Sequence, residues 1–356
     1  MKNFILLFKK PLVFFLLLTP WFLLAQTIHI VNNNPDVSAD FTDLQSAINA
    51  ASAGDILYVQ HSPTTYGNVT LNKDLTIIGR SHSDNGYTTT IGTMSISNGA
   101  SNATVRGCDI NALNQTGSST TIDGLSFLDN DINSFGLGST HTFTNLLLQG
   151  NVFRSTFTLS QNSSNVTITN NLFFSGSISF YMVDTLFFSY NVMGNTGNMS
   201  INNYATTNSL LNISNCIFVL NASADRTVTL NRNGTNTIQI DDCVTYNYNN
   251  TYTYNFETDT YITINANVQE NTNPLFTNVT PGTPASIAGT QTNYDPLNDD
   301  LTLQGASPVN NDGLYEGYKF INLGLPTGYP SVKVLSYDPT IAKNGTLNVT
   351  IEAKTN

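Results

Sequence analysis

The segments VTITNNLF (residues 166–173) and LFFSYNVM (residues 186–193) share one pattern: a short β-prone run, a turn, an Asn and further apolar residues. This frame occurs seven times, at successive spacings of 22, 21, 20, 20, 25 and 27 residues. A repeat of this length predicts a solenoid rather than a single compact domain. The central residues of the frames, called the anchors below, are Cys108, Asn130, Asn151, Asn171, Asn191, Cys216 and Cys243.

The composition of the repeats favours a parallel β-helix over a leucine-rich horseshoe. The units are rich in Thr, Val, Ile, Phe, Ser and Asn, which favour strands and tight turns, and none has a helical period. Coiled parallel strands place equivalent residues of successive units about 4.8 Å apart. We therefore predict an all-β fold, a single-stranded parallel β-helix in which the anchors stack on one another.

The anchors are predicted to point into the solenoid at a bend. An inward Asn amide can hydrogen-bond the Asn and the backbone of the next unit, and Cys is small enough to take the same place. Cys216 and Cys243 would lie on adjacent units, but stacked parallel side chains do not easily reach the dihedral angle of a disulfide. All three cysteines are therefore expected to be buried free thiols.

The first 25 residues have the features of a secretory signal peptide. Lys2, Lys9 and Lys10 precede an apolar run over residues 12–24 and the small residue Ala25. The apolar run is short for a membrane span. We predict a signal peptide over residues 1–25 and a secreted or cell-surface protein, with no membrane span after cleavage.

The chain that follows the signal peptide is strongly acidic. Without the three lysines at positions 2, 9 and 10 it has 10 basic and 24 acidic residues, a charge near −14. Nucleic acid is therefore not an expected partner. The same charge repels acidic polysaccharides unless a cation bridges the two molecules.

One segment near the N-terminus has helical periodicity. Four apolar residues from Leu44 to Ala51 recur at i, i+3, i+4 and i+7, and Thr42 with Gln45 matches a capping box. The first coil of a solenoid exposes an apolar end that needs a cover. We therefore predict a capping helix over about residues 41–51.

The segments around this helix resemble a known superfamily. DFTDLQSAINAASAGDILYV (residues 40–59) and SPTTYGNVTLNKDLTIIGR (residues 62–80) are similar to the start of secreted bacterial right-handed parallel β-helix proteins of the pectin-lyase-like superfamily. NPLF (residues 273–276), LQGASPVNNDG (residues 303–313) and LYEG (residues 314–317) resemble their closing segment. The resemblance implies a right-handed solenoid over residues 27–319. It implies no single function, because the superfamily includes lyases, hydrolases, esterases, tailspikes and adhesins.

The chain changes character after Phe320. LGLPTGYP (residues 323–330) is rich in turn-forming residues, and apolar residues alternate on both sides of Lys343-Asn344-Gly345, as in a hairpin. We predict a small β-rich C-terminal extension over residues 320–356 that covers the last coil. A role in sorting or attachment is the alternative.

Two arginines are the candidate catalytic residues. The resemblance implies that a lyase of this fold would use an Arg or Lys base, with a cation such as Ca²⁺ neutralising a uronate carboxylate. There is no lysine between residues 81 and 318, so the base would be Arg106 or Arg154. The Gly-His-Gly and Arg-x-Lys elements of the superfamily's hydrolases are absent from the sequence.

Three aspartates are the candidate Ca²⁺ ligands. Asp109 and Asp131 each follow an anchor, so they should stack on the outside of the solenoid with Asp129 beside them. Stacked carboxylates repel one another unless a cation or an arginine lies between them. An exposed acidic patch without a metal is the competing interpretation.

Tyrosines are the candidate glycan-binding residues. Tyr246, Tyr248, Tyr252 and Tyr254 lie in a run that is rich in Thr and Asn, and they alternate in two sets. Exposed Tyr rings match the apolar face of a sugar, while neighbouring amides and hydroxyls match its hydroxyl groups. Burial of the same rings is the competing interpretation.

Three functions remain open from the sequence. The missing lysines, the missing hydrolase motifs and the Asn- and Thr-rich surface favour a non-catalytic protein that binds a polysaccharide or cell-surface glycan, or that supports adhesion. One alternative is a Ca²⁺-assisted lyase acting on a uronate-containing polymer. The other is a structural spacer without a ligand.

Overall fold

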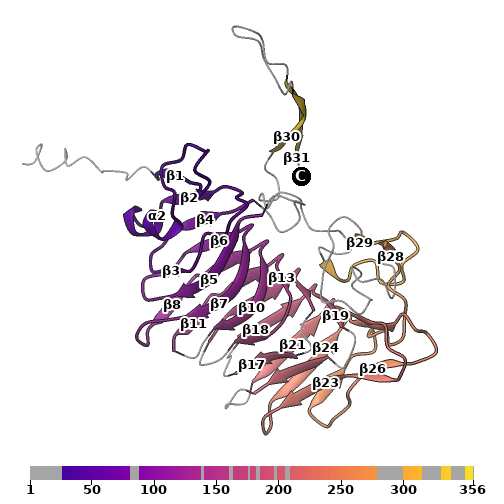
Figure 1. The fold of residues 1–356 in the computed structure, drawn as a ribbon. Coiled ribbons are helices and arrows are strands. Elements are labelled where there is room, and N and C mark those ends of the chain that lie inside the picture. The colour runs from indigo at the N-terminus through magenta and orange to yellow at the C-terminus, as the bar shows by residue number, and fades with distance from the viewer. Residues whose placement is uncertain are drawn as a thin grey trace, which may run out of the picture.

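The computed structural model is a parallel β-solenoid whose coils stack from β1 at one end towards β26 at the other (Figure 1). Residues 26–80, 88–137, 140–159, 163–174, 177–181, 185–195, 199–204, 209–278, 300–314, 330–337 and 349–355 are described. The predicted signal peptide, residues 1–25, lies outside them. Within these residues, no helix is long and apolar enough to cross a membrane.

The first sheet has 11 parallel strands. Successive strands pair in register, so that one position on each strand forms a row along the solenoid. In order, the strands are β1 (Ile28–Val31), β2 (Ile56–Val59), β4 (Thr76–Ile78), β6 (Thr104–Arg106), β9 (Ser126–Leu128), β12 (Leu147–Gln149), β15 (Val166–Thr169), β18 (Thr185–Ser189), β21 (Leu210–Ser214), β24 (Thr237–Asp241) and β27 (Ile262–Ile264).

The second sheet has 14 strands. Its early coils use one long strand each, whereas later coils divide the same path into two shorter strands, because β10 pairs with both β13 and β14. The strands are β3 (Val69–Leu71), β5 (Thr90–Ile96), β7 (Asp109–Gln115), β10 (Asp131–Leu137), β13 (Val152–Phe153), β14 (Phe157–Leu159), β16 (Leu172–Phe173), β17 (Ser177–Phe180), β19 (Val192–Asn195), β20 (Ser200–Asn203), β22 (Ile217–Leu220), β23 (Arg226–Arg232), β25 (Val244–Asn247) and β26 (Tyr254–Phe256).

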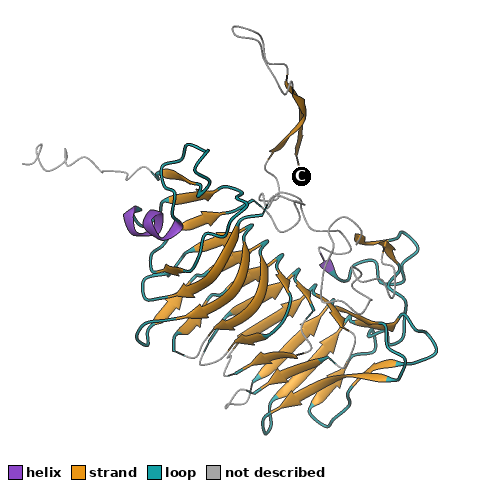
Figure 2. Cartoon of the chain, in the orientation of Figure 1, coloured by secondary structure: helices purple, strands orange, loops and turns teal. Residues whose placement is uncertain are grey.

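Three two-stranded sheets complete the fold. β8 (Thr121–Asp123) and β11 (Thr142–Thr144) are parallel, whereas β28 (Phe276–Asn278) and β29 (Asp300–Leu303) are antiparallel. β30 (Pro330–Tyr337) and β31 (Val349–Thr355) form the antiparallel pair predicted near the C-terminus. An all-β parallel solenoid is thus confirmed, and Figure 2 shows an α-helix beside its strands at the N-terminal end.

A left-handed residue bends the chain between the two sheets just before every anchor. Gly, Asn and Asp tolerate positive φ best, which explains most of the residues at this position. The bend turns the following anchor inward. The residues before the anchors, with φ between 45° and 70°, are Gly107, Asp129, Gly150, Asn170, Tyr190, Asn215 and Asp242.

The Asn anchors form a hydrogen-bonded ladder inside this bend. Asn151 Oδ1 accepts bonds from the backbone N–H and the Nδ2 of Asn130, both at 3.0 Å. Asn171 and Asn191 do the same for the anchors before them, at 2.9 to 3.1 Å. The ladder ends where the Asn191 N–H donates to Cys216 Sγ at 3.4 Å. It satisfies amide groups that would otherwise be buried without partners.

The three cysteines are buried free thiols. Burial raises the pKa of the Cys108 thiol to about 12 and also raises the pKa of Cys243. Because the thiolate is the reactive form, these side chains are suited to filling the bend rather than to chemistry.

Apolar side chains fill the space between the sheets. Rings stack along the solenoid, with Phe135 4.5 Å from Phe157 and Phe153 4.8 Å from Phe173 between centroids. All four side chains are buried in one continuous core. Each ring contributes about 1.5–3 kcal/mol of burial free energy.

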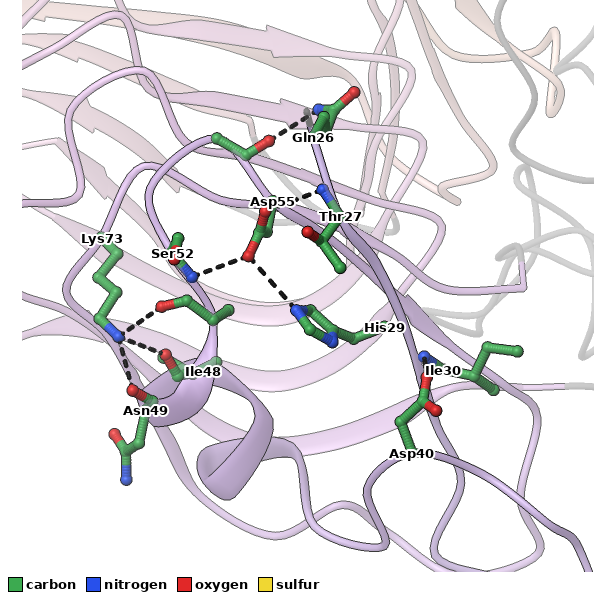
Figure 3. A network of polar contacts seen from close by, with 12 residues as sticks. Gln26, Thr27, His29, Ile30, Asp40, Ile48, Asn49, Ser52, Asp55 and Lys73 are labelled. Atoms are coloured by element: carbon green, nitrogen blue, oxygen red, sulfur yellow. Dashed lines mark hydrogen bonds and ion pairs between the residues drawn. The ribbon is translucent and has the colours of Figure 1, made fainter. Parts of the chain in front are cut away.

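The helix α2 (Leu44–Ala50) covers the N-terminal end of this core, burying Leu44, Ala47 and Ile48. The ammonium group of Lys73, in the next coil, donates to the carbonyls of Ile48, Asn49 and Ala51 at 2.7 to 2.9 Å (Figure 3). These carbonyls lie at the end of the helix, where intrahelical partners are missing. The lysine therefore ties the cap to the solenoid.

Asp55 joins the cap to β1. It accepts hydrogen bonds from the backbone N–H groups of Thr27 at 2.9 Å and Ser52 at 2.8 Å, and its Oδ2 lies 3.3 Å from His29 Nε2 (Figure 3). The Thr27 bond is the main cause that lowers the pKa of this carboxyl group.

The start of the helix differs from the prediction of about residues 41–51. Asp43 is the N-cap and accepts from the Ser46 N–H at 2.7 Å, so Thr42 does not form a capping box. The Oε1 of Gln45 instead accepts from the Thr70 N–H at 2.6 Å, outside the helix. A contact with β3 thus replaces the local contact that the sequence pattern predicted.

Candidate functional site

Asp109 and Asp131 lie in register on β7 and β10, as the anchor spacing predicts. Arg154 donates to both carboxylate oxygens of Asp131, with distances from 2.5 to 3.0 Å. Thr90 Oγ1 donates to Asp109 Oδ2 at 3.2 Å. Burial, and then the nearby charge of Asp131, raise the pKa of Asp109. The cation beside this pair of carboxylates is therefore an arginine.

Asp129 belongs to a different contact. Its left-handed backbone directs the side chain to Arg106, whose Nη2 lies 2.8 Å from Asp129 Oδ2. In the described part of the chain, no group of three or more His, Cys, Asp or Glu side chains could hold a metal ion. The residues predicted as one Ca²⁺ site, Asp109, Asp129 and Asp131, are divided between two arginine contacts and do not fit that ion.

Neither candidate base is arranged for proton abstraction. Arg106 and Arg154 each pair with a carboxylate, and Arg106 is buried as well. An ion pair stabilises the charged guanidinium, whereas a general base must be neutral. The geometry therefore gives the lyase hypothesis no base among the two residues named for it.

The predicted tyrosine cluster does not form one platform. Tyr254 is 1% exposed in the main core, and this burial raises the pKa of its hydroxyl. Tyr246 and Tyr248 meet edge to face, with centroids 5.1 Å apart, and pack against a second apolar cluster outside the solenoid. Tyr252 is half-buried. The rings are divided because Tyr254 points inward from β26, whereas Tyr246 on β25 and Tyr248 just after it lie on the outside.

The second apolar cluster includes the later part of one outward row of the second sheet, and this row is called the outer column below. Its early members are polar and its later members are apolar. A returning segment, residues 300–314, packs Leu301, Val309 and Leu314 against the apolar members. The column consists of Thr90, Asp109, Asp131, Val152, Leu172, Val192, Ile217 and Val244.

Hydrogen bonds attach the returning segment to the bend. The Gly313 N–H donates to the Asn215 carbonyl at 2.8 Å, and Asn215 Nδ2 donates to Asp312 Oδ1 at 3.2 Å. Burial raises the pKa of Asp312 to about 7, and the charge of Asp242 adds to the shift. Gly313 has φ +73° and lies so close to Ile217 that a Cβ would be 2.7 Å from its Cδ1. The left-handed backbone therefore favours glycine, and a Cβ would also displace the end of the Ile217 side chain.

The other outward surface of the second sheet presents neutral polar side chains and tyrosines, with the carboxylate of Glu257 at its β23 edge, where it accepts from the Leu230 N–H at 2.8 Å. We call it the Ser/Asn/Tyr face. It lies on β14, β17, β20 and β23, and registers across these strands place like side chains in rows. Its members are Thr158, Ser177, Ser179, Tyr181, Ser200, Asn202, Tyr204, Thr229 and Asn231.

An aromatic pair lies at one side of the Ser/Asn/Tyr face. Tyr181 follows β17 and Tyr204 follows β20, and their ring centroids are 5.2 Å apart with 45° between the planes. Tyr181 is 37% exposed and Tyr204 is half-buried. Tyrosine rings are enriched at binding surfaces, because they combine an apolar body with a polar hydroxyl.

An asparagine organises the polar part of the face. Asn202 Nδ2 donates to the hydroxyls of Ser177 and Ser179, each at 2.9 Å, and Asn202 Oδ1 accepts from Asn231 Nδ2 at 2.8 Å. Asn202 is 5% exposed, because these neighbours and the ring row surround it. The hydroxyl and amide groups are therefore held in fixed positions.

The sequence contained a signal for this face that the tyrosine cluster obscured. SISFY (residues 177–181) and SINNY (residues 200–204) both read Ser-x-(Ser/Asn)-x-Tyr, with alternate residues facing outward. Period two identifies such a face in a half-buried strand. The pattern could have been found by aligning the units on their second strand instead of on their anchors.

An open cleft of about 290 Å³ lies in the first coils. Tyr58 at its edge is 38% exposed, and Asn32 Nδ2 donates to Gln60 Oε1 at 2.8 Å. The cleft combines an exposed ring with amides, so it is the natural comparison site for the Ser/Asn/Tyr face. Its lining residues are Asn32, Val37, Tyr58, Val59, Gln60, His61 and Arg80.

Comparisons with known proteins give no relative for this chain. No protein-family model matches it, and neither a curated protein nor a solved structure matches it.

Proposed function

We propose that this protein is an exported, non-catalytic β-solenoid that binds a glycan on its Ser/Asn/Tyr face. The observation that carries the proposal is the ring pair of the exposed Tyr181 and the half-buried Tyr204 beside the network of Asn202. Aromatic rings stack on the apolar face of a sugar ring, and fixed hydroxyls and amides bond its hydroxyl groups.

Surface geometry favours binding over the two alternatives. A lyase needs a neutral base beside a bound uronate, and both candidate arginines are in ion pairs. A spacer needs no exposed ring, whereas Tyr181 is 37% exposed on an otherwise polar face. The proposal therefore moves the glycan site from Tyr246 and its neighbours to Tyr181 and Tyr204.

The resemblance quoted above supports two further parts of this proposal. We infer that the solenoid is right-handed and belongs to the pectin-lyase-like superfamily, and that the protein is secreted or held at the cell surface after removal of residues 1–25. An N-terminal sequence of the extracellular protein that begins near Gln26 would support export. Recovery of the full-length chain inside the cell would contradict it.

Affinity electrophoresis tests the binding function. The protein without residues 1–25 should migrate more slowly in gels that contain the recognised polysaccharide, and the Tyr181→Ala/Tyr204→Ala variant should lose about ten-fold in affinity. Tyr58→Ala is the matched control, because Tyr58 has nearly the same exposure on the other sheet. Equal retardation of the double variant and the wild type would contradict the proposal. Release of unsaturated uronate products would instead establish a lyase.

A further inference from the structure

The charge of the Ser/Asn/Tyr face limits what it can bind. All of its side chains are neutral, although the exported chain is near −14 overall. Arg226 and Arg232 are the charged residues of β23, and alternation along the strand places them in the opposite set from Thr229 and Asn231. Arg232 also pairs with Asp259 at 2.7 Å and stacks on Tyr261 at 4.1 Å. The face therefore offers no cation to an acidic sugar.

Binding an acidic polymer there would be unfavourable. A carboxylate or sulfate that leaves water needs a charged or strongly donating partner, and the net charge of the protein repels it. A neutral sugar needs hydroxyl and amide partners and an apolar contact. These are the groups that the face presents.

The arrangement of the rows limits the direction of the ligand. Ser177, Ser200 and Thr229 form one row of hydroxyls across three strands. A second row runs through Ser179 and Asn202, and the two rings form a third. Neighbouring members of a row are about 4.8 Å apart. Each row thus repeats similar chemistry across the strands, whereas the chemistry changes from residue to residue along a strand.

Resting on the function proposed above, we infer that the ligand is an uncharged linear glycan whose chain crosses β14, β17, β20 and β23 along the solenoid axis. Successive sugar units then meet similar groups on successive coils. Asn202 is a positioning residue in this arrangement, because it orients the two serine hydroxyls while being almost fully covered.

Isothermal titration calorimetry with oligosaccharides tests this inference. The probes are cello-, xylo-, manno- and chito-oligosaccharides from disaccharide to hexasaccharide, with oligogalacturonate as the acidic probe. At least one neutral series should gain affinity about ten-fold between disaccharide and tetrasaccharide, because four strands span only about 14 Å, and little beyond. Oligogalacturonate of equal length should bind about ten-fold more weakly or not at all.

Variants locate the binding on the face. Tyr181→Ala should weaken the binding of the neutral probe about ten-fold, and Tyr58→Ala should leave it unchanged. Thr229→Lys should increase the affinity for oligogalacturonate relative to the neutral series. Asn202→Ala should reduce the gain in affinity with oligosaccharide length. Asn202→Gln should keep more of this gain than Asn202→Asp, because glutamine keeps the amide donor.

The outcomes separate this inference from the binding function. Binding that depends on Tyr181 but is as tight for the acidic probe, or is the same for disaccharide and hexasaccharide, overturns the inference and leaves the glycan site standing. Absence of binding by all probes, or binding that is insensitive to Tyr181→Ala, overturns both.

Discussion

Two outward surfaces of the second sheet lie on the same coils and differ in almost every respect. The later part of the outer column is apolar and is covered by residues 300–314, whereas the Ser/Asn/Tyr face is polar and open. The backbone geometry is the same in both, since each consists of outward-facing residues on parallel strands in register. The polarity of the side chains therefore matches what lies outside each strand. This is another part of the protein in one case, and solvent or a ligand in the other.

The outer column makes the same distinction along its own length. Asp109 and Asp131 occupy it where it is partly exposed, and Val192 and Ile217 occupy it where the returning segment covers it. One position in a repeat can thus change from charged to apolar without a change of fold. The position in the repeat determines whether the side chain points inward or outward, and coverage by residues 300–314 determines whether an outward side chain is apolar.

The largest expected effect comes from placing a charge under the cover. Ile217→Asp should cost about 3–5 kcal/mol or undock residues 300–314, because Ile217 is 0% exposed and no partner would compensate the carboxylate. Urea unfolding and hydrogen exchange of residues 305–314 measure the two possibilities. Thr158→Asp, on the Ser/Asn/Tyr face, is the control and should cost under about 1 kcal/mol. Similar costs for the two variants would contradict the distinction between the surfaces.

A smaller effect should come from the buried carboxyl group that holds the cover. The pKa of Asp312 is about 7 in the folded protein and 3.8 ordinarily, so the folded state holds a proton that the unfolded state releases. The stability should therefore fall as the pH rises from about 4 to about 7 and remain lower above that. Asp312→Asn keeps an acceptor for Asn215 and should remove this fall, a gain on the order of 2 kcal/mol at about pH 8.

Urea midpoints at about pH 5 and about pH 8 measure this difference. Asp242→Asn should give a partial gain, because the charge of Asp242 is one cause of the raised pKa of Asp312. The same difference between the two pH values in the wild type and in Asp312→Asn would contradict the assignment.

The partly exposed end of the outer column should depend moderately on its ion pair. A double-mutant cycle with Arg154→Ala and Asp131→Ala should give a coupling free energy of about 1–2 kcal/mol, because the contact is bidentate and the two side chains keep only 20% and 14% of their exposure. The coupling should shrink further in about 1 M salt. A coupling of several kcal/mol would show that this end is as critical to stability as the covered end.

The smallest effect on stability is expected at the ring that carries the proposed function. Tyr181→Ala should change the unfolding free energy by less than about 1 kcal/mol, because the residue is 37% exposed and contacts the Tyr204 ring outside the core. Its neighbour Phe180 points inward and is 1% exposed, so Phe180→Ala should cost about 3–5 kcal/mol. Thermal unfolding of the two variants makes the comparison. An equally destabilised Tyr181→Ala would mean that the ring serves the fold.

Local patterns predicted most of the fold. The spacing of the anchors gave the parallel register, since Asp131 pairs with Asp109 as the repeat requires. The left-handed residues before the anchors are visible as Gly, Asn and Asp, with Tyr190 as the exception. What the repeat did not fix was each side chain's partner, because Gln45 and Asp129 each turn to a residue on another coil.

The candidate site was less predictable because it depends on contacts between distant segments. Residues 300–314 cover Ile217, which is nearly a hundred positions earlier, and no local pattern indicates such a contact. Alternation identified the faces of the tyrosines near Tyr254 but not which face was buried. SISFY and SINNY contained the necessary period, yet only the register of β17 and β20 brings Tyr181 and Tyr204 together.

A crystal structure with the tightest-binding neutral oligosaccharide would test the central claim most directly. Our account predicts sugar density that crosses β17, β20 and β23, with rings against Tyr181 and Tyr204 and hydroxyl groups on the network of Asn202. Density confined to the cleft beside Tyr58, or a chain that runs along a single strand, would contradict it.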